Sequence, residues 1–168
     1  MRQRAMIALA LACRPKILLA DEPTTALDAT VQIQILLLLR ELQAEFGMSM
    51  IFVTHDIGVA VEICDRIAVM YAGQIVESGA LRDIVRDARH PYAQGLLAST
   101  VHGNPGGSRL ETIPGAPPSL SEPPTACQFA PRCRHARQTC HQMPPPAVEL
   151  GARRMVRCVL AEPQGVPA

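Results

Sequence analysis

The chain of 168 residues contains no tryptophan, and aromatic residues make up only 3% of it. Proteins that hold single-stranded nucleic acid commonly stack its bases on aromatic side chains, so this composition argues against such a partner. The formal net charge is +1, with 16 basic and 15 acidic residues, and it gives no electrostatic reason to expect nucleic acid or an anionic membrane surface. Apolar runs such as Ile35–Leu39 are far shorter than the roughly 18 or more residues that cross a bilayer. We therefore expect no transmembrane segment and no nucleic-acid partner.

Glycine and lysine are also scarce where they would matter for phosphate binding. No glycine precedes Gly47, and Lys16 is the only lysine. A phosphate-binding loop of the form G-x-x-x-x-G-K-[ST] uses glycine-rich backbone to surround phosphates and lysine to neutralise them. The sequence therefore contains no loop of this kind.

The apolar residues alternate between short runs typical of buried strands and periodic stretches typical of helices. The predicted helices cover 2–13, 28–46, 56–64, 81–86 and a short stretch from residue 91, and the predicted strands cover 17–20, 50–54, 67–71 and 74–77. Asp28 is the predicted N-cap of the longest helix and Gly47 its end. The last two strands form a predicted hairpin through Ala72–Gly73. This order predicts an α/β fold with parallel strands and flanking helices, whose ligands bind beyond the carboxyl ends of the strands.

The later part of the chain is rich in proline, because all but three of the 15 prolines lie at Pro105 or beyond. Gly103–Gly107 reads as a turn-rich linker. Proline disfavours long helices and central strands, so we expect this part to need some other means of staying ordered. We predict two regions: an α/β region over 1–86, and a proline- and cysteine-rich C-terminal extension over 87–168.

Acidic residues stand at the end of the first predicted strand. Hydrolysis of ATP requires a carboxylate that holds magnesium, a base that orients the attacking water, and donors for the charge on the γ-phosphate. Asp21 is the candidate magnesium ligand and Glu22 the candidate base. His55 follows the next strand and is a candidate contact for the γ-phosphate. Each residue alone is equally consistent with a solvated acid or a hydrogen-bonded histidine, but their order and spacing together indicate nucleotide hydrolysis.

These residues resemble the nucleotide-binding domain of ABC transporters, which is a P-loop NTPase domain. In this resemblance Asp21 and Glu22 end a Walker B strand, and His55 is the H-loop histidine. The D-loop contains Thr25, where serine is commoner, and ends at Asp28. The resemblance implies ATP and magnesium as cofactors, with cofactor-binding roles for Asp21, Thr25 and Asp28 and catalytic roles for Glu22 and His55.

Four of the six cysteines lie in the extension. They are Cys127, Cys133, Cys140 and Cys158. Because thiols stay reduced in the cytoplasm, such a group favours metal binding over disulfides. Four thiolates can hold a four-iron cluster or a zinc ion, and the spacing alone leaves the metal open; the alternative is four thiols without a ligand, or disulfides formed after purification. Cys13 and Cys64, at helix ends beside apolar residues, are predicted to be small buried fillers.

Two further segments, His90–Leu97 and Ile113–Pro118, resemble the C-terminal extension of oligopeptide and dipeptide transporter ATPases. Some members of that family carry an iron–sulfur cluster in this extension, which favours a four-iron four-sulfur cluster over zinc. The resemblance also implies an energy-coupling subunit of an importer for oligopeptides or dipeptides, although relatives with this extension also serve nickel. The implied partners are a second ATPase subunit, two membrane-spanning permease subunits and, indirectly, an extracytoplasmic peptide-binding protein, all assembled at the inner membrane with this subunit on its cytoplasmic face.

Neither the phosphate-binding loop nor the signature loop of that family is present, so we expect the chain to be a C-terminal part of such a subunit. Removing even one hydrogen-bond donor that stabilises a transition state lowers the reaction rate about a hundredfold. We therefore expect the chain alone to bind ATP poorly and to hydrolyse it negligibly. We also expect an exposed apolar patch where the other half would pack. The competing hypotheses are a metal-binding interaction module without hydrolytic activity and a nonfunctional remnant.

Overall fold

The computed structural model describes residues 2–99, 112–119, 124–151 and 153–161. The chain divides into two compact units, Met1–Cys64 and Asp65–Ala168, which are described here one at a time. The predicted boundary at residue 86 is based on sequence composition, whereas the two units are defined by contacts between residues. The two divisions therefore describe different things, and the boundary at residue 86 stays a prediction. Within the described residues, no helix is both long and apolar enough to cross a membrane.

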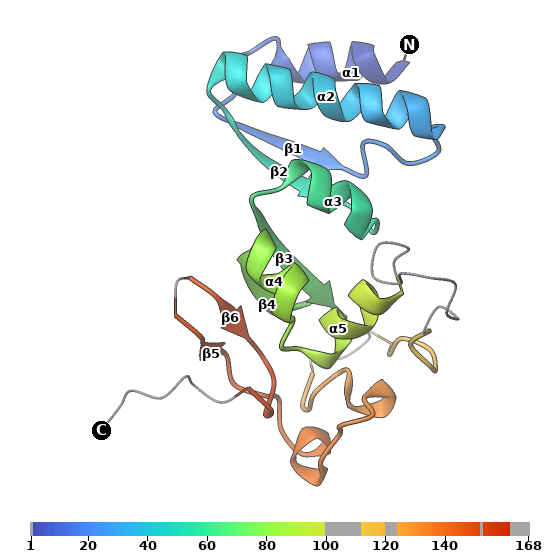
Figure 1. Ribbon diagram of the computed structural model, residues 1–168, viewed down its shortest axis with the longest axis vertical. Coiled ribbons are helices and arrows are strands. Elements are labelled where there is room, and N and C mark those ends of the chain that lie inside the picture. Colours follow the sequence, from blue (N-terminus) through green and yellow to red (C-terminus); the bar gives the residue numbers. More distant parts are fainter. Residues whose placement is uncertain (1, 100–111, 120–123, 152, 162–168) are drawn as a thin grey trace. The chain divides into compact units, whose positions relative to one another are not determined.

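The first unit alternates helices with strands (Figure 1). Its elements are α1 (Arg2–Leu11), β1 (Ile17–Asp21), α2 (Ala29–Phe46), β2 (Ser49–Val53) and α3 (Ile57–Ile63). The two strands pair in parallel, with Leu19 opposite Ile51. All five elements that the sequence predicts here are present, with ends displaced by one or two residues.

Helix α2 begins and ends at the residues that the sequence predicts. The Asp28 side chain accepts a hydrogen bond from the Val31 backbone N–H at 2.9 Å, which satisfies one of the donors left free at a helix start. Gly47 adopts the left-handed conformation with φ 59°, which glycine tolerates without a steric penalty. Both predicted caps are confirmed.

The two faces of the β1–β2 sheet differ in their surroundings. On one face Leu18 is buried, and it shares a core with residues of all three helices, among them Ile35 and Leu39 of α2. On the other face the side chains of Ile17, Leu19, Ile51 and Val53 are 57%, 72%, 55% and 51% exposed. Parallel sheets are normally covered on both faces, so this second face is the exposed apolar patch that the sequence leads us to expect.

The second unit is built on a four-stranded antiparallel sheet with the order β3-β4-β6-β5. Its elements are β3 (Arg66–Tyr71), β4 (Gln74–Ala80), α4 (Leu81–Asp87), α5 (Pro91–Ala98), the 3-10 helices η2 (Ala130–Arg132) and η3 (Gln138–His141), β5 (Val148–Glu149) and β6 (Met155–Val156). The predicted hairpin is β3–β4. Its turn residues Ala72 and Gly73 both have positive φ, at 48° and 77°, as a tight two-residue hairpin turn requires.

One expectation drawn from the high proline content of the extension is wrong. Strand β6 lies inside the sheet, between β4 and β5, although we expected no central strand in this part of the chain. Its two residues are not prolines, so they can pair on both sides, and Val156 is fully buried. The predicted linker at 103–107 lies outside the described residues.

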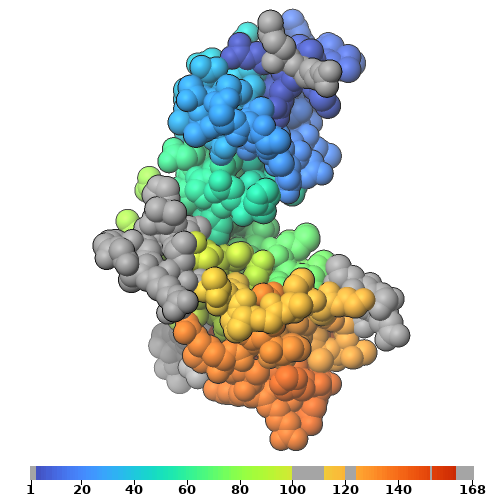
Figure 2. All heavy atoms as spheres, turned by 90° about the vertical axis from the view of Figure 1, so that its right-hand side faces the viewer, coloured from blue at the N-terminus to red at the C-terminus, as the bar shows by residue number. Residues whose placement is uncertain are grey.

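Aromatic packing and one arginine hold the extension against the hairpin. The rings of Tyr71, Tyr92 and Phe129 lie within 4.6–5.5 Å of one another, centroid to centroid. The Arg132 guanidinium lies over the Tyr71 ring at 5.9 Å and donates hydrogen bonds to the carbonyls of Ile113 and Pro114. In the space-filling view, residues 112–119 (yellow) and the segment that follows residue 124 (orange) accordingly form one continuous surface (Figure 2).

A buried ion pair makes a second connection between β4 and the end of the extension. Glu77 is fully buried, and its carboxylate lies 2.9 Å from the Arg154 guanidinium. The same carboxylate accepts hydrogen bonds from the backbone N–H groups of Arg89 and His90. These charge-assisted contacts hold the proline-rich extension, which has little regular secondary structure, against β4.

Candidate functional site

The first candidate site lies at the carboxyl ends of β1 and β2. Asp21 is the last residue of β1 and Glu22 follows it, while His55 stands two residues beyond the end of β2. Because the strands are parallel, these ends meet at one edge of the sheet. The Glu22 backbone N–H donates to the Val53 carbonyl at 2.9 Å, so the pairing continues past β1 and brings Glu22 toward the segment that carries His55.

The Glu22 carboxylate is engaged at both oxygens. The Thr25 hydroxyl donates to Oε2 at 2.8 Å, and His55 Nδ1 lies 3.1 Å from Oε1. The Glu22 and His55 side chains are 45% and 75% exposed, so water and ligands can reach both. The pKa of the Glu22 carboxyl lies below its ordinary value, because the Thr25 hydroxyl and, next, the His55 ring stabilise its charged form.

A tight turn brings Thr25 to Glu22. Glu22 and Ala26 both have positive φ, at 44° and 63°, a conformation uncommon for residues other than glycine. Within this turn the Thr25 backbone N–H donates to the Glu22 carbonyl at 3.2 Å. Strained backbone of this kind gathers at functional sites, where the surrounding structure holds it in place.

The other two predicted residues of this site differ in their placement. Asp21 is exposed at the edge of the sheet beside Glu22, where a magnesium ion could approach it, and its role as a ligand stays a prediction. Asp28 uses its carboxylate to cap α2. The structure therefore brings together Glu22, Thr25 and His55, and it gives Asp28 a structural function. Sequence reasoning did not anticipate that Thr25 would contact Glu22, and the only signal was their i, i+3 spacing across Pro23.

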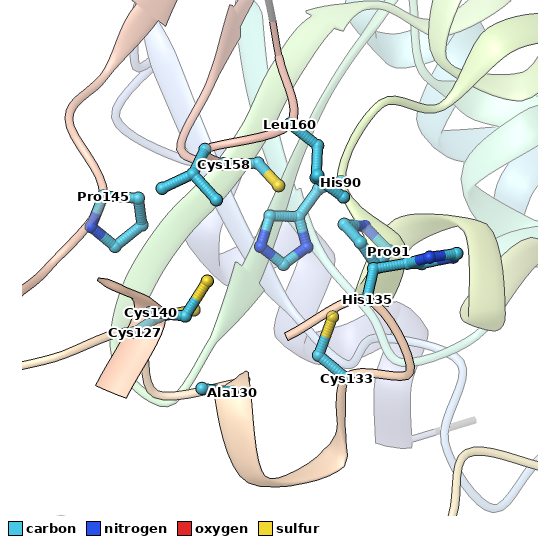
Figure 3. A pocket seen from close by; sticks show the side chains of 11 residues that line it. His90, Pro91, Cys127, Ala130, Cys133, His135, Cys140, Pro145, Cys158 and Leu160 are labelled. Atoms are coloured by element: carbon cyan, nitrogen blue, oxygen red, sulfur yellow. The ribbon is translucent and has the colours of Figure 1, made fainter. Parts of the chain in front are cut away.

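A second candidate site is a small pocket in the second unit, where the four cysteines of the extension meet (Figure 3). The pocket is lined by His90, Pro91, Cys127, Ala130, Cys133, His135, Cys140, Pro145, Cys158, Val159 and Leu160. The backbone N–H of Cys127 donates to the Cys140 carbonyl at 2.9 Å, which fixes two of these cysteines side by side. Cysteines that are up to 31 residues apart in the sequence thus line the same pocket.

The thiols of this pocket are not arranged as a metal site. In the part of the chain that the structure describes, no group of three or more His, Cys, Asp or Glu side chains could hold a metal ion. No disulfide joins the four cysteines of this pocket. Burial raises the pKa of the Cys127, Cys133 and Cys158 thiols, so in the absence of a metal these thiols are protonated at neutral pH. The predicted iron–sulfur cluster therefore gains no support from this arrangement, and neither does the alternative zinc ion.

The two cysteines outside this pocket differ from each other. Cys64 is half-buried and packs against the core of the first unit, as predicted. Cys13 is exposed, and its predicted burial is wrong, because α1 ends at Leu11 and leaves Cys13 in the turn that follows.

His90 is the residue of the second unit that sequence reasoning missed. It is the N-cap of α5, where its Nδ1 accepts a hydrogen bond from the Tyr92 backbone N–H at 3.1 Å. The side chain is buried beside the cysteine pocket, with 2% of the residue exposed, and burial lowers its pKa to about 4. An imidazole that accepts at Nδ1 must be unprotonated there, so burial and capping both favour neutral His90. The sequence signal was His-Pro at a helix start, which we read only as part of a family resemblance.

Comparison with known proteins gives one consistent result. Residues 76–140 match the family described as the C-terminal region of oligopeptide/dipeptide transporters. The chain is 53% identical over 145 residues to the oligopeptide transport ATP-binding protein of Salmonella typhimurium, covering 86% of this chain and 43% of that protein. It is 51% identical over 158 residues to the dipeptide transport ATP-binding protein of Haemophilus influenzae, covering 94% of this chain and 48% of that protein. The oligopeptide transport ATP-binding protein of Bacillus subtilis is 49% identical over 165 residues, 97% of this chain and 46% of that protein. The chain thus spans about half the length of the curated relatives it matches.

Proposed function

Because the chain belongs to the family of oligopeptide/dipeptide transporter ATP-binding proteins, we propose that it supplies the hydrolytic carboxylate of an ABC importer's ATPase subunit. The observation that carries this proposal is the 3.1 Å contact between Glu22 and His55 at the shared carboxyl edge of two parallel strands. An acid and a histidine in reach of each other, exposed at this edge, are what in-line attack of water on a γ-phosphate requires.

Each residue has one role in this proposal. Glu22 orients the attacking water and accepts its proton, and its lowered pKa keeps it ionised at neutral pH. His55 donates a hydrogen bond to the γ-phosphate, and Asp21 holds magnesium, which when bound offsets the negative charge of the phosphates. Each Glu22 oxygen accepts one hydrogen bond here and keeps a second lone pair, so water can bind the carboxylate while both contacts remain.

The proposed chemistry also needs a phosphate-binding loop, which these 168 residues do not contain. We propose that polypeptide outside them supplies that loop and covers the exposed face formed by Ile17, Leu19, Ile51 and Val53. Two features support this: the bare apolar face lies next to Glu22 in sequence and in the sheet, and the relatives are about twice as long as the chain. In this proposal residues 1–86 belong to the ATP-binding domain and 87–168 to the extension.

The proposed setting rests on the family resemblance, and the relatives' names support only its peptide-transport part. We propose that the working subunit lies on the cytoplasmic face of the inner membrane with a second ATPase subunit, two permease subunits and, indirectly, a peptide-binding protein. The transported solute is a peptide in this proposal. Substrate choice belongs to those partners, because none of the residues proposed for this chain contacts the solute.

A chimaera tests the proposal. Residues 1–168 would replace the matching part of the Haemophilus influenzae dipeptide transport ATP-binding protein, whose remaining half would provide the missing polypeptide. We expect the chimaera to hydrolyse ATP and to support dipeptide uptake, and the Glu22→Gln chimaera to bind ATP but to lose both activities. A wild-type chimaera that folds and binds ATP without hydrolysing it would contradict the proposal and favour the interaction-module or remnant hypotheses.

The cysteine pocket requires a separate experiment. The resemblance to the transporter family implies a metal-bound pocket, whereas the structure supports a pocket of free thiols. All four cysteines line one pocket, which is the observation that keeps a metal under test. The free-thiol state predicts that all four pocket cysteines react with a thiol reagent in denaturant and that no stoichiometric metal remains after anaerobic purification. One bound zinc, or about four irons with visible absorbance, would show instead that the pocket rearranges around a metal.

A further inference from the structure

The proposed base, Glu22, has little packing to hold its side chain in one place. Its side chain is 45% exposed, and a glutamate side chain in water samples many rotamers. A base must nevertheless lie within hydrogen-bond reach of one particular water. The orientation of the carboxylate therefore depends on the groups bound to its two oxygens.

Of those two groups, the Thr25 hydroxyl is held more firmly. Thr25 belongs to the turn that starts at Glu22, and its backbone N–H donates to the Glu22 carbonyl, so backbone and side chain bind the same residue. His55 comes from a different segment, beyond β2, and its side chain is 75% exposed.

We propose that Thr25 is a positioning residue for Glu22: its hydroxyl fixes Oε2 so that Oε1 faces His55 and the space where water would attack. This inference rests on the proposed role of Glu22 as the base. The donor is a hydroxyl on a residue of the same turn, so its distance from Oε2 is set by local backbone and not by packing between distant segments.

Two substitutions separate the hydroxyl from the shape of the side chain. Thr25→Val removes the donor and keeps the volume, whereas Thr25→Ser keeps the donor. Thr25 is exposed, so neither change removes core packing, and circular dichroism will check that α1 to α3 are retained.

The first measurement uses the 168-residue chain itself. Three-bond scalar couplings about the χ1 and χ2 bonds of Glu22, measured by NMR at one pH and assigned with Glu22→Gln, report whether its side chain keeps a single rotamer. We expect the couplings of one rotamer in the wild type and in Thr25→Ser, and rotamer-averaged couplings in Thr25→Val. Equal couplings in all three proteins would overturn the proposal.

The second measurement uses the chimaera described above. We expect Thr25→Val to lower kcat about tenfold with little change in KM, because positioning acts on the chemical step, and Thr25→Ser to restore it. An unchanged kcat in Thr25→Val would refute positioning even if the Glu22 couplings change. If the Glu22→Gln chimaera remains active, the proposed function fails, and the NMR couplings still decide separately whether Thr25 positions the Glu22 carboxylate.

Discussion

Acidification should destabilise the second unit through His90. This imidazole is buried, and its Nδ1 accepts the hydrogen bond that caps α5. A proton on Nδ1 would remove the acceptor and place a charge among apolar rings, including that of Phe129 at 5.8 Å. The folded unit therefore resists protonation, and the unfolded chain does not.

The magnitude follows from the two pKa values. The folded value is about 4 and the ordinary value 6.5, so between these limits the unfolded state binds more protons and stability falls as pH falls. One pKa unit corresponds to about 1.4 kcal/mol, so lowering the pH from 7.5 to 5 should cost about 2 kcal/mol of unfolding free energy. Below about pH 4 the loss from His90 levels off, because both states are then protonated.

Tyrosine fluorescence in urea provides the assay. The only two tyrosines, Tyr71 and Tyr92, lie in the second unit beside His90, and no tryptophan masks them. His90→Asn is the matched control, because asparagine is a good N-cap without a titration in this range. We expect the wild type to lose about 2 kcal/mol between pH 7.5 and 5 and His90→Asn to lose much less. Equal losses in the two proteins would refute the assignment of a buried neutral imidazole.

Three further outcomes follow from other contacts. Glu77→Ala should destabilise the second unit by about 3 kcal/mol, since it leaves the largely buried Arg154 charge with only its longer ion pair to Asp87, at 3.7 Å. Urea unfolding measures this, and Glu149→Ala, at an exposed position, should change little. Asp28→Ala should cost the first unit about 1 kcal/mol by removing the acceptor for the Val31 N–H, whereas Asp28→Asn should cost much less, as thermal unfolding followed by circular dichroism at 222 nm would show. The isolated chain should show no micromolar ATP affinity by calorimetry, because no phosphate-binding loop is present, and a dissociation constant in that range would contradict this.

Local signals made much of the fold predictable. Asp28 and Gly47 determine the ends of α2 through contacts within a few residues, and Ala72–Gly73 likewise determines the hairpin turn. Strand β6 was not predictable, because two residues carry no periodicity and their partner on β4 is far away in sequence. The prolines misled us there, since they flank β6 without occurring in it.

The candidate site was predictable only in part. The sequence order placed Glu22 and His55 after successive strands, and parallel pairing brings those ends together. The contact from Thr25 forms within a turn whose first residue, Glu22, has positive φ although it is not glycine, a conformation for which the sequence gives no reliable signal. For the cysteines, the sequence predicted their proximity but not the burial that keeps their thiols protonated.

The measurement that tests the central claim most directly is the rate of ATP hydrolysis by the chimaera with and without Glu22→Gln, at saturating ATP. A general base contributes about a hundredfold or more, and glutamine keeps the shape of glutamate without its basicity. The account predicts that the Glu22→Gln chimaera still binds ATP but hydrolyses it at least about a hundredfold more slowly. Hydrolysis within about twofold of the wild-type chimaera would show that Glu22 is not the hydrolytic carboxylate.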